Sequence, residues 1–326
     1  MRNVASLGCP MHRFNEHHPE FKGFSDYYHR EVFPLLAARE GARKAALRNV
    51  VILGGVIAAI TICAVIYLTS SQRDAQLSIF ALFIGVGAIA ALYTWLIKGV
   101  KSETKEKIVG SICAYIGWTF RAEVTEAPDL NYWSQLGLLP KGFQAGRIFG
   151  GKRASFEDEL SGEAHGAQFK SVEVHLEQKG DKSYHTVMRG QLMTLTFPRK
   201  FLGRTVVLRD KGFLQGKKKG DMKRVGLADP VFEKIFEAYS TDQVESRYLL
   251  DPVFMQKLVD LERSVDGKNI RFGFIDGQLL IVVETPNRFE AGSMLKPLTA
   301  PERTQKILDE IGAVYDVVDG VMSSKS

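Results

Sequence analysis

Two long apolar runs constrain the fold of this chain more than any other feature of its sequence. The first covers residues 50–69 and the second residues 77–97, and only Arg73 and Asp74 carry a charge between Arg48 and Lys98. A helix needs about 20 residues to cross ~30 Å of hydrocarbon. Neither run has the polar stripe of a helix on the surface of a globular domain. The sequence therefore predicts a transmembrane helical hairpin over residues 49–98.

Small residues recur four positions apart in both runs. The pairs are Gly55 and Ala59, Ala81 and Gly85, and Gly87 and Ala91. This spacing lets two helices approach closely in a solvent that provides no hydrophobic attraction between them. We therefore expect the two spans to pack against each other.

Basic residues flank the hairpin on the sides away from its connecting loop. Arg39, Arg43, Lys44 and Arg48 precede the first run, and Lys98, Lys101, Lys105 and Lys107 follow the second. The connecting loop offers only Arg73, beside Asp74. Because basic residues favour the cytoplasmic side of a membrane, both the N-terminal and the C-terminal parts are predicted to be cytoplasmic.

The residues before the hairpin divide into two parts. Residues 1–20 are polar and aperiodic, which predicts a disordered tail; the alternative is a metal site, since Cys9, His12, His17 and His18 are ligand types. Residues 21–48 are predicted to form an amphipathic helix that Pro34 kinks or restarts and that could continue into the first span. Its apolar stripe consists of Phe21, Phe24, Tyr28, Val32 and Leu35.

Residues 99–326 are long enough for one further domain. From Arg147 to Leu208 the apolar period falls to two, with repeated glycine breaks, which predicts antiparallel strands. Asp-Pro pairs at 229–230 and 251–252 are typical helix starts, and Asp276-Gly277 suits a tight hairpin turn. A last helix is expected over residues 301–318. The fold class is therefore α+β, a cytosolic domain with a mainly antiparallel sheet and flanking helices.

One predicted strand pair carries residue types that suit catalysis. Glu173 and His175 share one face of their strand, and a turn at residues 179–181 would place His185 opposite His175. Two imidazoles and a carboxylate could hold a metal or act as a general base. The exposed polar face of an antiparallel sheet explains the same residues without any function.

Two further segments are candidates for binding. The first is a glycine-rich basic segment that is one residue too short for a phosphate loop and lacks its Ser or Thr; it is either a solvated loop or a contact for anionic lipid or a partner. Its candidate residues are Lys217, Lys218, Lys219, Lys223 and Arg224. The second is a polar run predicted as a functional loop or a structural cap, with Asp242, Glu245 and Arg247.

Several stretches resemble the bacterial domain-of-unknown-function family 3137. They are residues 239–252, 272–277, 158–162, 171–174 and 201–206, together with the helix around Tyr28, Glu31 and Pro34. The triplet Met188-Arg189-Gly190 departs from the family pattern, which has Phe before the glycine. The resemblance implies a bacterial inner-membrane protein with two spans and a cytosolic domain. It implies no activity and no catalytic residues.

Together these features favour an inner-membrane-anchored binding or scaffold module with a protein partner. The alternatives are a membrane-tethered, metal-assisted hydrolase that uses the Glu and His cluster and a peripheral module that binds anionic lipid. The net charge of +6 is mild, and no aromatic residues interleave with the lysines, so we expect no nucleic-acid partner. The three cysteines form no CxxC motif, nucleophile and zinc motifs are missing, and we expect no cofactor or resident metal.

Overall fold

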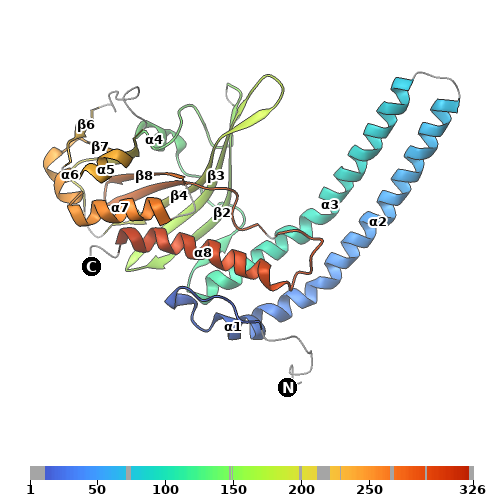
Figure 1. Ribbon diagram of the computed structural model, residues 1–326, viewed down its shortest axis with the longest axis horizontal. Helices are drawn as coiled ribbons and strands as arrows, with labels where there is room; N and C mark the ends of the chain where they lie inside the picture. The colour runs from blue at the N-terminus through green and yellow to red at the C-terminus, as the bar shows by residue number, and fades with distance from the viewer. Residues whose placement is uncertain are drawn as a thin grey trace. The chain divides into compact units, whose positions relative to one another are not determined.

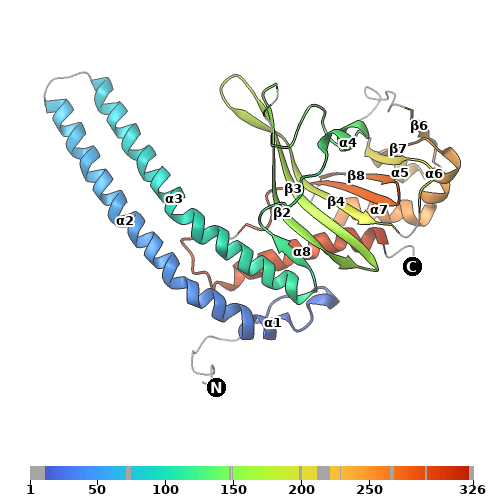
Figure 2. The same ribbon diagram turned by 180° about the vertical axis from the view of Figure 1, so that it is seen from behind.

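The computed structural model describes residues 12–70, 75–146, 148, 150–197, 200–210, 221–227, 229–264, 268–290 and 292–322 (Figures 1 and 2). The chain forms two compact units. The first contains Met1–Ser111 and Glu290–Lys306, and the second contains Ile112–Phe289 and Ile307–Ser326.

Two long helices dominate the first unit. A short 3-10 turn, Pro19–Phe21, precedes α1, Phe24–Tyr27, and a π-helical turn, Tyr28–Val32, leads from α1 into α2, Phe33–Ser70. The second long helix is α3, Ala75–Tyr115. Both are long and apolar enough to cross a membrane. Helix α2 continues unbroken into the first apolar run, as the lack of a strong breaker allowed.

The π-helical turn changes which side chains of the N-terminal helix are buried. Phe24, Tyr28 and Val32 are buried as predicted, but Leu36 is buried next and Leu35 is exposed. A π turn holds more residues than an α turn, so the stripe advances by four positions to Leu36. The predicted place of Leu35 in the stripe was therefore wrong.

The segment before this helix is packed at Phe14. Its ring is buried, with its centroid 4.7 Å from that of Tyr28 and 5.5 Å from that of Phe24. The tail predicted over residues 1–20 therefore does not extend to Phe14. Residues 1–11, which include Cys9, lie outside the described residues.

Glycine brings α2 and α3 close together at one of the predicted small-residue pairs. A Cβ atom at Gly85 would lie 2.2 Å from the Oγ1 of Thr61, closer than atoms can approach. Gly54 lies opposite Ile89, whereas a Cβ atom built on Gly55 or on Gly87 would meet open space. The close contact is thus centred on Gly85 and Thr61, where glycine is required by packing.

The described part of the second unit contains a nine-stranded antiparallel sheet. In chain order its strands are β1 Thr119–Arg121, β2 Lys152–Ala164, β3 Ala167–Lys179, β4 Tyr184–Thr196, β5 Thr205–Arg209, β6 Lys223–Val225, β7 Phe236–Ser240, β8 Lys268–Ile275 and β9 Gln278–Glu284. Their order across the sheet is β1-β2-β3-β4-β9-β8-β5-β7-β6. Asp276 and Gly277 both have positive φ in the β8–β9 turn, as predicted for a tight hairpin.

Helices cover both faces of this sheet. They are α4 Leu130–Gln135, α5 Pro230–Ile235, α6 Gln243–Leu249, α7 Pro252–Ser264 and α8 Pro301–Met322. Trp133 of α4 packs in one core with Ile275, whereas Phe254 of α7 packs on Phe274, with ring centroids 5.8 Å apart. Because neighbouring residues of a strand point to opposite faces, α4 and α7 lie on opposite sides. The α+β class is confirmed.

We predict that Gly85→Ala destabilises the hairpin because the added methyl group overlaps Thr61. Overpacking of this kind costs about 1–3 kcal/mol. Thermal unfolding of the full chain in detergent measures the effect. Gly87→Ala is the matched control, since its new methyl group meets open space, and equal melting temperatures for the two variants would contradict the prediction.

Candidate functional site

The structure does not bring His175 and His185 together. Lys179 pairs with Tyr184, so the β3–β4 turn comprises residues 180–183 rather than 179–181, and a bulge lies between Leu176 and Glu177. His175 is opposite Arg189, and His185 is opposite Gln178. The predicted register was wrong because turn length and a bulge set the pairing of a hairpin, and neither is visible in the apolar pattern.

The polar residues of this strand face bind one another. Glu173 is buried, and its Oε1 accepts a hydrogen bond from Nε of Arg189 at 2.8 Å and lies 2.8 Å from Nη2 of the same residue in an ion pair. The Nε2 of His175 lies 2.8 Å from the Oγ1 of Thr186. Burial lowers the pKa of His175, and repulsion from Arg189 and Arg153 adds to this against the attraction of Glu177. The strand face is therefore a structural ion-pair network.

The described residues contain no group of three His, Cys, Asp or Glu side chains placed to hold a metal ion. The geometry at Glu173, His175 and His185 thus gives no support to a metal-assisted hydrolase.

The polar run at residues 241–248 is the start of a helix and not a loop. The Oδ1 of Asp242 accepts from the backbone N–H of Val244 and of Glu245, each at 2.9 Å, and so caps α6. The buried carboxylate of Glu245 accepts from Leu202 N at 2.8 Å and from Gly203 N at 2.7 Å. Two of the three predicted functional residues are therefore structural, and Arg247 alone is exposed.

These bonds belong to a network that fixes the β4–β5 loop against α6. The Oγ1 of Thr241 accepts from Arg204 N at 2.9 Å, and Arg204 O accepts from Thr241 N at 3.0 Å. A Cβ atom at Gly203 would lie 2.8 Å from the Cβ of Asp242, so only glycine allows this approach. The loop and the helix start are held as one rigid corner.

This corner exposes three large apolar side chains, which we call the α6 corner surface. Leu202 is 89% exposed, Val244 is 81% exposed and Tyr248 is 72% exposed. Val244 and Tyr248 lie four positions apart and therefore on the same face of α6. None of these three residues was predicted from the sequence. The available signal was the i, i+4 spacing of Val244 and Tyr248, two apolar residues that follow the Asp242 cap.

Basic residues lie on α6, on the neighbouring strand β6 and in the β4–β5 loop. The Nε2 of Gln243 donates to Lys223 O at 3.3 Å, which joins the edge strand β6 to α6. The structure thus brings two predicted binding segments together. The exposed basic residues of these elements are Lys223, Arg224 and Arg247; Arg204 is half-buried and is paired with Asp221 at 2.6 Å. Lys217, Lys218 and Lys219 lie outside the described residues.

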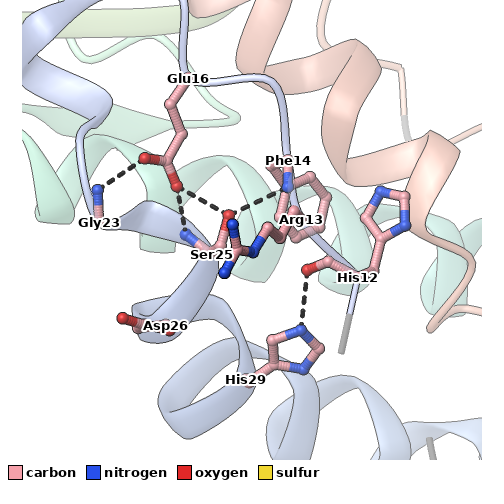
Figure 3. A pocket seen from close by; sticks show the side chains of 8 residues that line it. All are labelled: His12, Arg13, Phe14, Glu16, Gly23, Ser25, Asp26 and His29. Carbon is pink, nitrogen blue, oxygen red and sulfur yellow. Dashed lines mark hydrogen bonds between the residues drawn. The ribbon is translucent and has the colours of Figure 1, made fainter. Parts of the chain in front are cut away.

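A separate hollow of about 380 Å³ lies in the first unit (Figure 3). It is lined by His12, Arg13, Phe14, Glu16, Gly23, Ser25, Asp26 and His29. The Glu16 carboxylate accepts from Gly23 N at 2.7 Å, from Ser25 N at 2.9 Å and from the Ser25 hydroxyl at 2.7 Å. Burial opposes ionisation of Glu16, but these hydrogen bonds outweigh it and lower the Glu16 pKa. They hold the entry to α1 in place.

The C-terminal part of the chain matches a known family model. Residues 186–322 match the family described as Protein of unknown function (DUF3137). The resemblance inferred from the sequence is confirmed over these residues, which include the α6 corner. No curated protein is significantly similar to this chain.

Among solved structures, the chain is similar to the crystal structure of the mycobacterial trehalose monomycolate transport factor A, TtfA. The identity is 12%, the alignment covers 67% of this chain and 94% of that chain, and the TM-score is 0.32. A similarity this distant transfers neither a fold nor a function.

We predict that Glu245→Gln destabilises the second unit, because a neutral amide has one oxygen to accept from the two N–H groups that the carboxylate now binds. The expected loss is about 1–3 kcal/mol, as for hydrogen bonds to a charged group. Thermal unfolding of the full chain in detergent provides the measurement. Arg247→Gln on the same helix removes an exposed charge and should change stability by less than about 0.5 kcal/mol; a larger loss for Arg247→Gln would refute this account.

Proposed function

We propose that this chain is a bacterial inner-membrane protein that binds a protein partner at the cytoplasmic face. The hairpin of α2 and α3 would anchor the chain, and the α6 corner surface would dock the partner. The single observation that supports docking is the rigid exposure of Leu202, Val244 and Tyr248 on a corner fixed by buried hydrogen bonds. Apolar side chains that are exposed together on a rigid surface are typical of binding sites.

The charges around this surface suggest the chemistry of the partner. Exposed Arg247 lies on α6, and exposed Lys223 and Arg224 lie on β6, which is hydrogen-bonded to α6. A partner segment with apolar side chains among Asp and Glu would match both features, because complementary charges steer association and fix its register.

Aromatic residues support the placement of the spans in a membrane. Tyr67 lies near the end of the first apolar run, and Tyr93 and Trp95 lie near the end of the second, with Tyr67 and Trp95 exposed. Tyr and Trp are enriched at the two membrane–water interfaces. The basic residues on both outer flanks of the hairpin favour a cytoplasmic location for both ends of the chain.

The proposed topology predicts the behaviour of reporter fusions. Green fluorescent protein fused after Ser326 should fluoresce, and alkaline phosphatase at the same place should be inactive. Alkaline phosphatase inserted within residues 71–74 should be active, because this loop is predicted to face the periplasm. Active phosphatase after Ser326 would show that the proposed topology is wrong. A chain that stays in the supernatant when cells are lysed without detergent would show that the proposed membrane anchor does not exist.

The docking surface predicts a position-specific crosslink in cells. A photoreactive amino acid at Val244 should give a discrete protein adduct, and the same group at Val253 of α7, which is also exposed, should not. Arg247→Glu should lower the yield at Val244 several-fold because it repels an acidic partner. An adduct with lipid in place of protein, or equal yields at Val244 and Val253, would contradict the proposal.

A further inference from the structure

Two buried arginines meet in the first unit, where α2 contacts the start of α8. Arg43 is 6% exposed and Arg303 is 8% exposed. Arg43 donates to Glu40 through Nε, at 3.0 and 3.1 Å, and through Nη2 at 2.5 Å, and its Nη1 donates to Met294 O at 2.7 Å. Glu40 also accepts from Leu298 N at 3.0 Å. The hydrogen-bonding capacity of Glu40 is thus used by Arg43 and Leu298.

Arg303 is less well satisfied than Arg43. Its Nη2 donates to Ser293 O at 2.9 Å, but its Nε and Nη1 are buried without a hydrogen-bond partner among the described residues. The buried hydroxyl of the next residue, Thr304, also has no hydrogen-bond partner among the described residues. Burial lowers the pKa of Arg303, and repulsion from Arg43 lowers it further. A buried charge with free donors is costly unless an anion joins it.

An exposed glycine is a neighbour of the unsatisfied side of Arg303. A Cβ atom built on Gly292 would lie 3.1 Å from the Nη1 of Arg303, and Gly292 is exposed with a φ of +72°. Gly292 brings no side chain to this donor. Arg303 lies in the first turn of α8, a helix of 22 residues. The dipole of this helix also favours an anion at its N-terminus, against the charge of Glu302 in the same turn.

This cluster lies at the depth of lipid headgroups if the hairpin spans a membrane. Arg43 is seven residues before Val50, where the apolar run begins, and seven residues of helix span about 10 Å. The loop that carries Met294 also exposes Leu295 and Lys296. Figures 1 and 2 show this loop between β9 and α8, beside the long helices of the same unit.

We propose that Arg303, together with the N-terminus of α8, binds the phosphate of an anionic phospholipid headgroup. Leu295 would enter the headgroup layer, and Lys296 would add a second charge for the phosphate. Guanidinium groups bind phosphate through strong charge-assisted hydrogen bonds. This inference rests on the membrane hairpin of the proposed function and not on its protein partner.

The test uses the full chain in neutral detergent micelles, titrated with short-chain phosphatidylglycerol. Binding should be saturable and should raise the melting temperature, because the ligand binds the folded state. Arg303→Gln should weaken the affinity about tenfold, the loss expected for a charge-assisted hydrogen bond. Arg263→Gln removes an exposed arginine of α7 and should leave the affinity unchanged.

Two parallel titrations identify the source of the phosphate. Phosphatidylcholine and inorganic phosphate should bind at least about tenfold more weakly than phosphatidylglycerol, since the first has no net charge and the second has no acyl chains. Equal binding of inorganic phosphate, or an unchanged affinity in Arg303→Gln, would overturn the proposal. Lys296→Gln at an exposed position provides a second variant with no folding risk, and it should weaken the affinity severalfold; an unchanged affinity would likewise overturn the proposal. If the chain is found in membranes but fails this test, the proposed lipid site is refuted and the proposed membrane anchor stands.

Discussion

The length and apolarity of α2 and α3, which are sufficient to cross a membrane, constrain the structure of the first unit. In hydrocarbon every backbone N–H and C=O must be bonded within the chain, so a span has to be an unbroken helix. Helices α2 and α3 satisfy this requirement and continue beyond the apolar runs. Since hydrocarbon gives no hydrophobic attraction between helices, their pairing depends on close packing, as at Gly85 and Thr61.

Buried and half-buried carboxylates fix several parts of the chain. Glu245 holds the β4–β5 loop, Glu173 binds Arg189, and Glu40 binds Arg43. Each accepts from a charged donor or from backbone N–H groups, which offsets the cost of its burial. Arg303 differs from these three carboxylates, because two of its nitrogens have no acceptor among the described residues. That imbalance suggests a ligand, whereas the satisfied carboxylates indicate structure.

Local chemistry made several elements predictable. The apolar runs, the Asp caps at Asp229 and Asp251, and the Asp276-Gly277 turn each depend on residues within a few positions of one another. The predicted β3–β4 register was wrong because the bulge between Leu176 and Glu177 and the length of the turn depend on packing against the neighbouring strands. Helix α6 was missed because its short start is stabilised by Asp242 and by the distant loop at Leu202.

The sequence by itself determined the two long apolar helices and the α+β class, because these follow from hydropathy and period along the chain. Only the tertiary structure decided which polar residues are free to act. It placed Glu173 and Glu245 in internal bonds, and it brought Lys223 beside α6 and Arg303 beside Arg43. These contacts join residues that lie tens to hundreds of positions apart in the sequence. Their free energies depend on burial, which cannot be derived from a local sequence pattern.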